Sequence, residues 1–528
     1  MTERVTLVLA TLLLAVIGLL PVFAMLRESV TADGGFSLDG YRALLRSEGQ
    51  LTRLMAHSIA LSLLTASIST LVGIALGVLL GKTDLPLRGS LTLLFTVPLL
   101  FPPYVLAVAW FSILGRTGLL GTVLPDSWSQ KISSEFFGLP GCAFVLATAF
   151  TPIAMLLTIA FLRSVNPRLE HAGRLVSGWS SILLRITLPL MVPAISFAAG
   201  LIFLLSMGEI SVPMYLRFPV YPVETLTQFA AFYDFRAANV AASPLFLVTL
   251  VILGLQTGVH KRVLLGRRTP SAEVALIALG PWRGPALALL LALAIVLVVL
   301  PIGSLVLQSH SLETYGAALA RAGESVLRSV AFAASAATLL TVFGFFWGYL
   351  AERRTLSFWW VNEWLALLLL ALPGSVIGIG LIGLWNHTGT NFIYASPAII
   401  ILGYLAQYAM LPLRAVSSSL AAVPRSLEEA AWLSGAGWLG TLRHIVGPLA
   451  GRGLLVAWLI SYVFCMRDVA MSIVVYPPGY DTLPVRILTL MANGAPSLIA
   501  ALCIILMTIT ILPLGAAGLW VRFVASRP

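Results

Sequence analysis

The scarcity of charged residues is the feature that most constrains how this chain can fold. Hydrophobic residues make up 59% of its 528 residues and charged residues 10%, and the mean hydropathy is +0.98. A soluble domain does not need so much apolar surface, whereas each membrane-spanning helix takes roughly 20 apolar residues. The apolar stretches are continuous and do not alternate with polar residues, which indicates helices rather than a barrel. We therefore expect an all-α polytopic membrane protein.

About twelve apolar runs are long enough to span a membrane. They begin near Val5, Ser58, Ser90, Gly141, Leu190, Ala241, Gly284, Val326, Phe358, Ser396, Leu449 and Ser497. Lys and Arg gather in the loops on one side of the membrane, and Asp and Glu gather mainly in the loops on the other side. This bias predicts that the N- and C-termini are cytoplasmic. It also accounts for the formal net charge of +11 without a nucleic-acid partner.

The chain repeats itself in the same direction. SLDGYRAL at 37–44 returns as SLETYGAA at 311–318, and Pro102 matches Pro373. At the spacing that relates Pro102 to Pro373, the residues Ser58, Gly73 and Gly77 match Ser329, Gly344 and Gly348. We predict a first half at 1–258, a basic cytoplasmic linker at 259–283 and a second half at 284–528. Six spans in each half give both halves one orientation, related by a pseudo-twofold axis along the membrane normal.

The usual signatures of catalysis and cofactor binding are not matched. GIALGVLLGKTD at 73–84 resembles a phosphate-binding loop, but Leu76 stands where its first glycine should be. The six histidines show no ligand spacing, and the three cysteines are far apart. We expect no catalytic residue, metal site or cofactor in this chain.

Two polar segments, each between the fourth and fifth spans of a half, stand out. The second, SLEEAAWLSGAGWLGTLRHIVGP at 426–448, has capping-box spacing from Ser426 to Glu429. It predicts a short helix over 428–434 that stops at Gly435, with acids and small residues facing another protein. The first, at 166–190, can begin a helix at Asn166 because a following proline suits the first turn.

The second segment resembles the EAA loop of binding-protein-dependent ABC importer permeases. The matching residues are Glu429, Ala430, Ala431, Gly435, Ile445 and Pro448, preceded by Glu428. In the first segment, the residues at these positions are His171, Ala172, Gly173, Ser177 and Pro189. Aligning Glu170 with Glu429 instead restores the spacing to Pro189 but loses the match to Gly435, and both alignments remain open.

This resemblance implies a fold, partners and a location. The fold would be two tandem six-helix type I importer permease halves. The fused arrangement, PPGYDTLPVRI at 477–487 and YPVETLTQF at 221–229 resemble the ferric-iron and thiamine branch. The implied partners are two copies of a cytoplasmic ABC ATPase that uses ATP-Mg, and a periplasmic or lipid-anchored solute-binding protein. The implied location is the bacterial inner membrane, among its lipids.

The solute pathway is expected where prolines and glycines interrupt the spans. Backbone groups freed in this way are tolerated in a membrane where they line a cavity, although simple helix kinking is the alternative for the prolines. Two carboxylates lie near the outer ends of later spans. The predicted pathway or gate residues are Pro102, Pro103, Pro373, Gly374, Glu209 and Asp468.

Three other classes of protein share some of these features. A twelve-helix secondary transporter driven by an ion gradient fits the repeat, but it leaves the two loops unexplained and usually keeps an ionisable relay at mid-depth. A membrane scaffold or receptor needs no duplication, and an ABC exporter should carry long cytoplasmic helices. Dependence on a separate ATPase distinguishes the importer from the secondary transporter.

Overall fold

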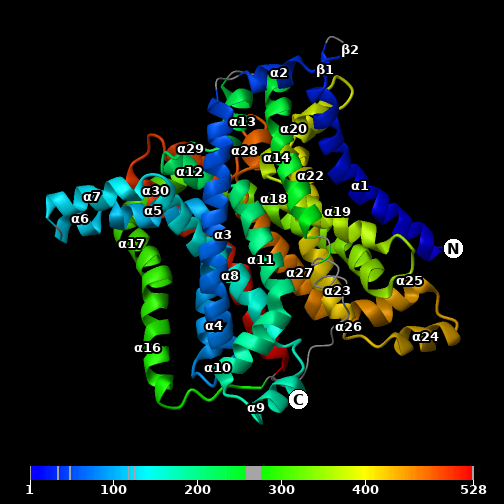
Figure 1. Ribbon diagram of the computed structural model, residues 1–528. Helices are drawn as coiled ribbons and strands as arrows, with labels where there is room; N and C mark the ends of the chain where they lie inside the picture. The colour runs from blue at the N-terminus through cyan, green and yellow to red at the C-terminus, as the bar shows by residue number, and fades with distance from the viewer. Residues whose placement is uncertain are drawn as a thin grey trace.

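A computed structural model describes residues 2–32, 35–46, 49–116, 118–123, 125–231, 234–256, 258 and 275–525. Within these residues the chain is helical apart from one short antiparallel hairpin and an isolated bridge (Figure 1). The predicted all-α fold is therefore confirmed. Residues 259–274 of the predicted linker lie outside the described residues.

The elements before the linker begin with a long helix and the hairpin. They are α1 (Thr2–Ser29), β1 (Thr31–Ala32), β2 (Gly35–Phe36), α2 (Asp39–Leu45), α3 (Gln50–Lys82), α4 (Arg88–Thr96), η1 (Val97–Leu100), α5 (Pro103–Leu114), α6 (Leu119–Val123), α7 (Asp126–Phe136), α8 (Leu139–Leu162), α9 (Pro167–Arg174), α10 (Trp179–Ile182), η2 (Leu183–Thr187), α11 (Leu188–Met207), α12 (Ser211–Tyr215), α13 (Tyr221–Ala230) and α14 (Phe235–Leu255).

The elements after the linker include the longest helix, α18. They are η3 (Gly280–Trp282), α16 (Arg283–Ala294), η4 (Ile295–Val299), α17 (Leu300–Ser309), α18 (Leu312–Arg353), α19 (Trp359–Ala371), α20 (Gly374–Trp385), α21 (Asn391–Tyr394), α22 (Ala398–Tyr408), α23 (Met410–Leu420), α24 (Arg425–Leu433), α25 (Trp438–Thr441), η5 (Leu442–Val446), α26 (Gly447–Leu449), α27 (Gly451–Met466), α28 (Ser472–Val475), α29 (Leu483–Leu490) and α30 (Pro496–Ala525).

The number of membrane spans agrees with the sequence. Among the described residues, nine helices are long and apolar enough to cross a membrane, or up to twelve if each of three bent pairs is one span. Large apolar side chains such as Leu9, Phe23 and Leu512 are more than half exposed on these helices, as lipid-facing residues are. The run expected from Ser90 is divided, because α4 and η1 end before Pro102 and α5 begins after it.

Repeated glycines mark equivalent helix contacts in the two halves of the sequence. A Cβ atom on Gly73 of α3 would lie 2.5 Å from the Cβ of Ala154 of α8. A Cβ on Gly344 of α18 would lie 2.5 Å from the Cβ of Pro412 of α23. The repeat thus preserves two positions at which helix backbones approach closely.

The first span of each half of the sequence packs against the other half (Figure 1); in the second half this span is Gly280–Ser309. Helix α1 contacts α19, α20 and α22, and α17 contacts α5 as well as α30. A Cβ on Gly380 of α20 would lie 2.4 Å from the carbonyl oxygen of Pro21, so this glycine is needed for the close approach of α1. The two halves therefore share one continuous hydrophobic core.

Candidate functional site

The two predicted loop helices, α9 and α24, lie at the same end of the molecule (Figure 1). Helix α9 starts as predicted, since the Asn166 side chain accepts a hydrogen bond from the backbone N–H of Arg168 at 3.0 Å. The predicted capping box of α24 is wrong. The helix starts at Arg425 behind Pro424, whose fixed φ suits a helix entry, so Ser426 lies inside the first turn. Glu429 instead faces Arg425 at 3.6 Å.

Glu170 anchors α9 through a buried ion pair. Its side chain is 1% exposed, and its two carboxylate oxygens lie 2.6 and 2.7 Å from Nζ of Lys82, which is fully buried. The hydroxyl of Thr187 donates a third hydrogen bond at 2.7 Å. A buried charge is tolerated where a counter-charge and further hydrogen bonds satisfy it, as here. Lys82 is the lysine of the segment at 73–84 that resembles a phosphate-binding loop, and its partner is therefore a structural one, Glu170.

Glu428 anchors α24 in the same way. Its side chain is 1% exposed, and one carboxylate oxygen lies 2.5 Å from Nη2 of Arg353. The hydroxyl of Tyr349 donates to the other oxygen at 2.8 Å. Lys82 ends α3 and Arg353 ends α18, at the spacing that relates Pro102 to Pro373.

These anchors align the first parts of the two loops, α9 with α24. Because Glu170 and Glu428 occupy the same structural position, His171 corresponds to Glu429, and both of these side chains are exposed. Sequence reasoning missed Lys82 and Arg353 as partners. The sequence pattern that could have indicated them is a basic residue at the end of a long apolar run, which occurs in both halves.

The loops differ by one residue where their helices end. Helix α24 has 9 residues and α9 has 8. Gly435 has φ +84°, a left-handed conformation that glycine adopts without strain. Ser177 matches Gly435 in the first loop, and the described residues with positive φ do not include it. Its N–H donates a hydrogen bond to the carbonyl oxygen of Gly173 at 2.9 Å. The first loop therefore turns without needing a glycine there.

Both loops close on a π-helical turn that the sequence did not predict. The turns are η2 and η5, each ending two residues before a proline, Pro189 or Pro448. A third π turn, η4, ends two residues before Pro301. Proline lacks an N–H and its ring clashes with the carbonyl four residues earlier, which favours a wider turn at that point. Ile445 lies within η5.

Both loops expose apolar residues at equivalent positions. Leu175 is 89% exposed and its counterpart Leu433 is 91% exposed. Leu169 and Leu427, another equivalent pair, are 50% and 41% exposed. Of the small residues, Ala172 and Ala430 are exposed, whereas Ala431 is buried. Exposed apolar residues repeated at one end of the molecule are typical of an interaction site.

The prolines predicted to line the pathway break helices rather than simply kink them. Helices α19 and α20 meet at an angle of 105° at Pro373. Pro102 holds the same N-cap position before α5 as Pro373 holds before α20. Side chains satisfy two carbonyl groups beside these breaks: Nη1 of Arg467 donates to Leu99 at 2.5 Å, and Nε2 of Gln407 donates to Leu372 at 3.0 Å.

A small cavity of about 100 Å³ lies between the two breaks. It brings together five of the six predicted pathway residues, namely Pro103, Pro373, Gly374, Glu209 and Asp468. Pro102 does not line the cavity and is buried between the lining residues Leu99 and Pro103. The cavity is also lined by Arg467, a residue that sequence reasoning missed.

The two carboxylates in this cavity are held by neighbouring hydrogen-bond donors. Oε1 of Glu209 accepts from the backbone N–H of Ser211 at 2.9 Å. Asp468 accepts from the N–H of Ser472 at 2.9 Å and from the hydroxyl of Tyr408 at 2.8 Å. Both carboxylates thus satisfy N–H groups at the starts of short helices, α12 and α28, as capping side chains do.

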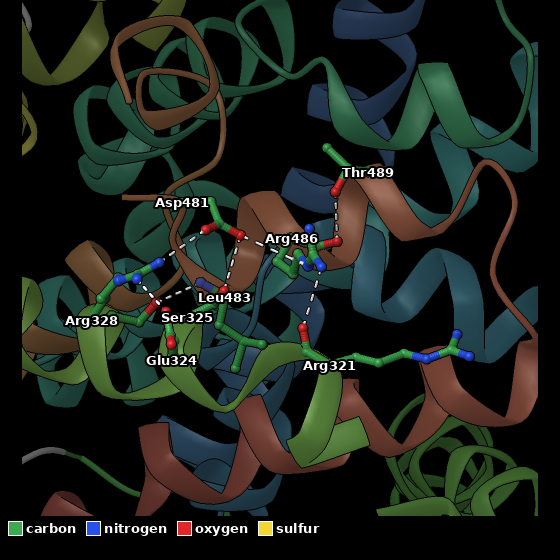
Figure 2. A network of polar contacts seen from close by, with 9 residues as sticks. Arg321, Glu324, Ser325, Arg328, Asp481, Leu483, Arg486 and Thr489 are labelled. Carbon is green, nitrogen blue, oxygen red and sulfur yellow. Dashed lines mark hydrogen bonds and ion pairs between the residues drawn. The ribbon is translucent and has the colours of Figure 1, made fainter. Parts of the chain in front are cut away.

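The segment at 477–487 is fixed against α18 by a polar network at the far end from the loops. Figure 2 shows Asp481 between Arg328 and Arg486, at 3.4 and 3.9 Å. The hydroxyl of Ser325 donates to Asp481 at 3.0 Å. Next to this network, the backbone N–H of Leu483 donates to Ser329 at 2.6 Å.

The repeated serines have equivalent roles in the two halves. The N–H of Tyr221 donates to Ser58 at 2.8 Å, as that of Leu483 donates to Ser329. In both cases a serine of a long helix, α3 or α18, accepts a hydrogen bond from the first N–H of a short helix, α13 or α29. YPVETLTQF and PPGYDTLPVRI are therefore structural counterparts.

Comparisons with known proteins give relatives that are transport permeases. No protein-family model matches the chain. Ferric transport system permease protein FbpB of Actinobacillus pleuropneumoniae is 25% identical over 458 residues, which is 82% of this chain and 66% of the relative, just under two thirds. Spermidine/putrescine transport system permease protein PotC of Haemophilus influenzae is 25% identical over 188 residues, 36% of this chain and 72% of the relative.

A third relative matches almost from end to end. "Probable ABC transporter permease protein y4fN" of Sinorhizobium fredii is 22% identical over 512 residues, which is 89% of this chain and 87% of the relative. Together with the apolar helices, these similarities support a multi-pass membrane protein with a permease role. All three relatives are named as permease proteins of transport systems or transporters.

Proposed function

We propose that this chain is the permease subunit of an ATP-driven importer in the bacterial inner membrane, with both termini cytoplasmic. Two copies of a separate cytoplasmic ATPase, using ATP-Mg, would bind the loops at 166–190 and 426–448. The observation that carries the proposal is the repeated, anchored geometry of these loops, each of which exposes a leucine, Leu175 or Leu433, at one end of the molecule.

The anchors offer a route for force from the loops into the bundle. The Glu170–Lys82 pair connects α9 to α3, and the Glu428–Arg353 pair connects α24 to α18. Helix α3 packs on α8 and α11, and α18 packs on α23 and α27. When the ATPase subunits draw the loops together, these helices would move with them. The permease would then alternate between states that open to opposite sides.

The same proposal places the gate at the cavity between the halves. The Arg467–Leu99 hydrogen bond joins α27 to η1, so opening this contact requires that bond to break. Gly208 is the counterpart of Arg467 in the first half. A Cβ on Gly208 would lie 2.9 Å from the Cα of Pro373. A cavity of about 100 Å³ holds a few water molecules. Its size fits a closed pathway.

We propose ferric iron as the solute, delivered by a periplasmic or lipid-anchored solute-binding protein. The support is the name of the ferric transport permease that matches 82% of this chain. None of the three relatives described above is named for thiamine, so the support favours iron within the predicted branch. The carboxylates of Glu209 and Asp468 would give a passing cation a favourable potential.

The proposal is tested by substituting the exposed leucines. The full chain is purified from its native host with gentle detergent, and co-purifying ATPase is measured for Leu433→Asp and for Leu175→Asp with Leu433→Asp. We expect each variant to insert normally and the double variant to lose most of the ATPase and of the ATP-driven transport. Leu312→Asp is the matched control, because Leu312 is 90% exposed on another part of the molecule.

Two results would contradict the proposal. One is ATPase association and transport unchanged in the double variant. The other is transport in vesicles that needs no ATP and follows an imposed ion gradient, which would favour the secondary transporter.

A further inference from the structure

A second cavity, of about 180 Å³, lies away from both the loops and the proposed gate. It forms where the C-terminal ends of α1 and α20 meet the start of α14. Its polar lining residues are Glu28, Asn239, Asn386 and His387. Helix α1 leads into β1, so the cavity lies at the end of the molecule opposite to α9 and α24 (Figure 1).

Glu28 brings a carboxylate without a paired cation to this cavity. Its Oε2 accepts a hydrogen bond from Nδ2 of Asn239 at 3.0 Å. Within the described part of the chain, no salt bridge involves Glu28. Arg236, one turn before Asn239, donates instead to the hydroxyl of Ser37 at 2.9 Å. The carboxylate therefore keeps free lone pairs.

Asn239 adds an oxygen that lacks a partner. Asn239 is 2% exposed, and its Oδ1 has no hydrogen-bond donor among the described residues. A carboxylate only accepts, so the bond to Glu28 fixes Nδ2 on that side and leaves Oδ1 as the unpaired acceptor. A buried amide oxygen without a donor or a cation is unfavourable, so a bound cation would stabilise it.

His387 adds a nitrogen lone pair. Its Nε2 lies 2.9 Å from the carbonyl oxygen of Gly383, so Nε2 must carry the hydrogen and Nδ1 of the neutral ring is bare. A Cβ on Gly383 would lie 2.8 Å from Oε2 of Glu28. This glycine therefore lets the end of α20 approach the carboxylate.

We propose that Glu28, Asn239 and His387 bind a divalent first-row transition-metal ion. All three residues line the cavity and each carries an acceptor with a free lone pair, and the C-terminal ends of α1 and α20 add partial negative charge. Imidazole nitrogen together with oxygen ligands favours such an ion over Mg²⁺ or Ca²⁺, and water completes the coordination. The site joins α1 and α14 to α20, and its existence does not depend on the proposed import.

The test uses the full chain, purified with a tag free of histidine, stripped with a chelator and dialysed against Zn²⁺ or Co²⁺. We expect one saturable Zn²⁺ per chain. His387→Gln and Glu28→Gln should each weaken binding at least tenfold. With Co²⁺, His387→Gln should shift the visible absorption of the bound ion, because a nitrogen ligand is lost. His310→Gln, which changes another exposed histidine, is the matched control and should leave binding unchanged.

Equal elution and melting of the variants would establish that they are folded. His387 is exposed, so its variant tests the site even if Glu28→Gln is less stable. Three outcomes would overturn the proposal: absence of saturable Zn²⁺ binding, as when water alone fills the cavity; binding that neither variant weakens; or a visible Co²⁺ spectrum that is the same in His387→Gln as in the wild type.

Discussion

Lys82→Met should release α9 from the body of the protein. The substitution leaves the carboxylate of Glu170, 1% exposed, with Thr187 as its remaining donor. Removing one partner of a buried ion pair costs about 3–5 kcal/mol when the other stays buried. Glu170 is the one residue of α9 that is buried, so little apolar contact opposes release of the helix.

The expected size of the effect follows from that cost. Each ~1.4 kcal/mol changes an equilibrium about tenfold, so a cost of about 3 kcal/mol lowers the ratio of docked to released α9 more than about a hundredfold. Hydrogen exchange of peptides covering 166–178 should accelerate accordingly. Peptides covering α24 should keep wild-type protection, which serves as the internal control.

A double substitution separates the ion pair from a general loss of stability. Lys82→Met with Glu170→Met replaces both charges by apolar side chains, a change that is often neutral for a buried pair. We expect α9 to regain most of its protection in the double variant. The reasoning is refuted if Lys82→Met alone leaves exchange at 166–178 unchanged, or if the double variant exchanges as fast as the single one.

Three further substitutions test other parts of the site. Gly435→Ala places a side chain at φ +84° and should destabilise the end of α24 by about 1 kcal/mol, seen as faster exchange there, whereas Ser177→Gly should bring no gain. Asp481→Asn should lower the free energy of unfolding by about 1–2 kcal/mol, seen as a lower melting temperature, because a half-buried network loses its charge; an unchanged melting curve would contradict this. Arg467→Gln removes the bond between the halves at Leu99 and should raise leakage or basal ATPase activity in vesicles; wild-type values would contradict the gate.

The sequence predicted the features that depend on local pattern. Apolar runs predicted the spans, and the residues around Asn166 predicted the start of α9. A direct match between Pro102 and Pro373 predicted two equivalent sites, which the structure shows as equivalent breaks. These features depend on residues close together in the chain or on repetition, and both are readable from one sequence.

Other features needed the fold. The capping box at Ser426 failed because Pro424 moved the helix start, so one local signal overrode another. The partners of Glu170 and Glu428 lie far away in sequence, at Lys82 and Arg353, and a lysine at the end of an apolar run is ordinarily explained by topology. Arg467 was missed for the same reason, since its acceptor Leu99 belongs to the other half of the chain.

The differences between the loops restrict what a partner can recognise. Glu429 of one loop corresponds to His171 of the other, so the two exposed positions differ in charge. If the two proposed ATPase subunits are copies, each must bind either loop, and recognition has to depend on what the loops share. The most exposed of the shared large apolar residues are Leu175 and Leu433, each five residues after a buried glutamate. Those leucines, rather than the acid of the EAA pattern, should therefore carry most of the binding energy.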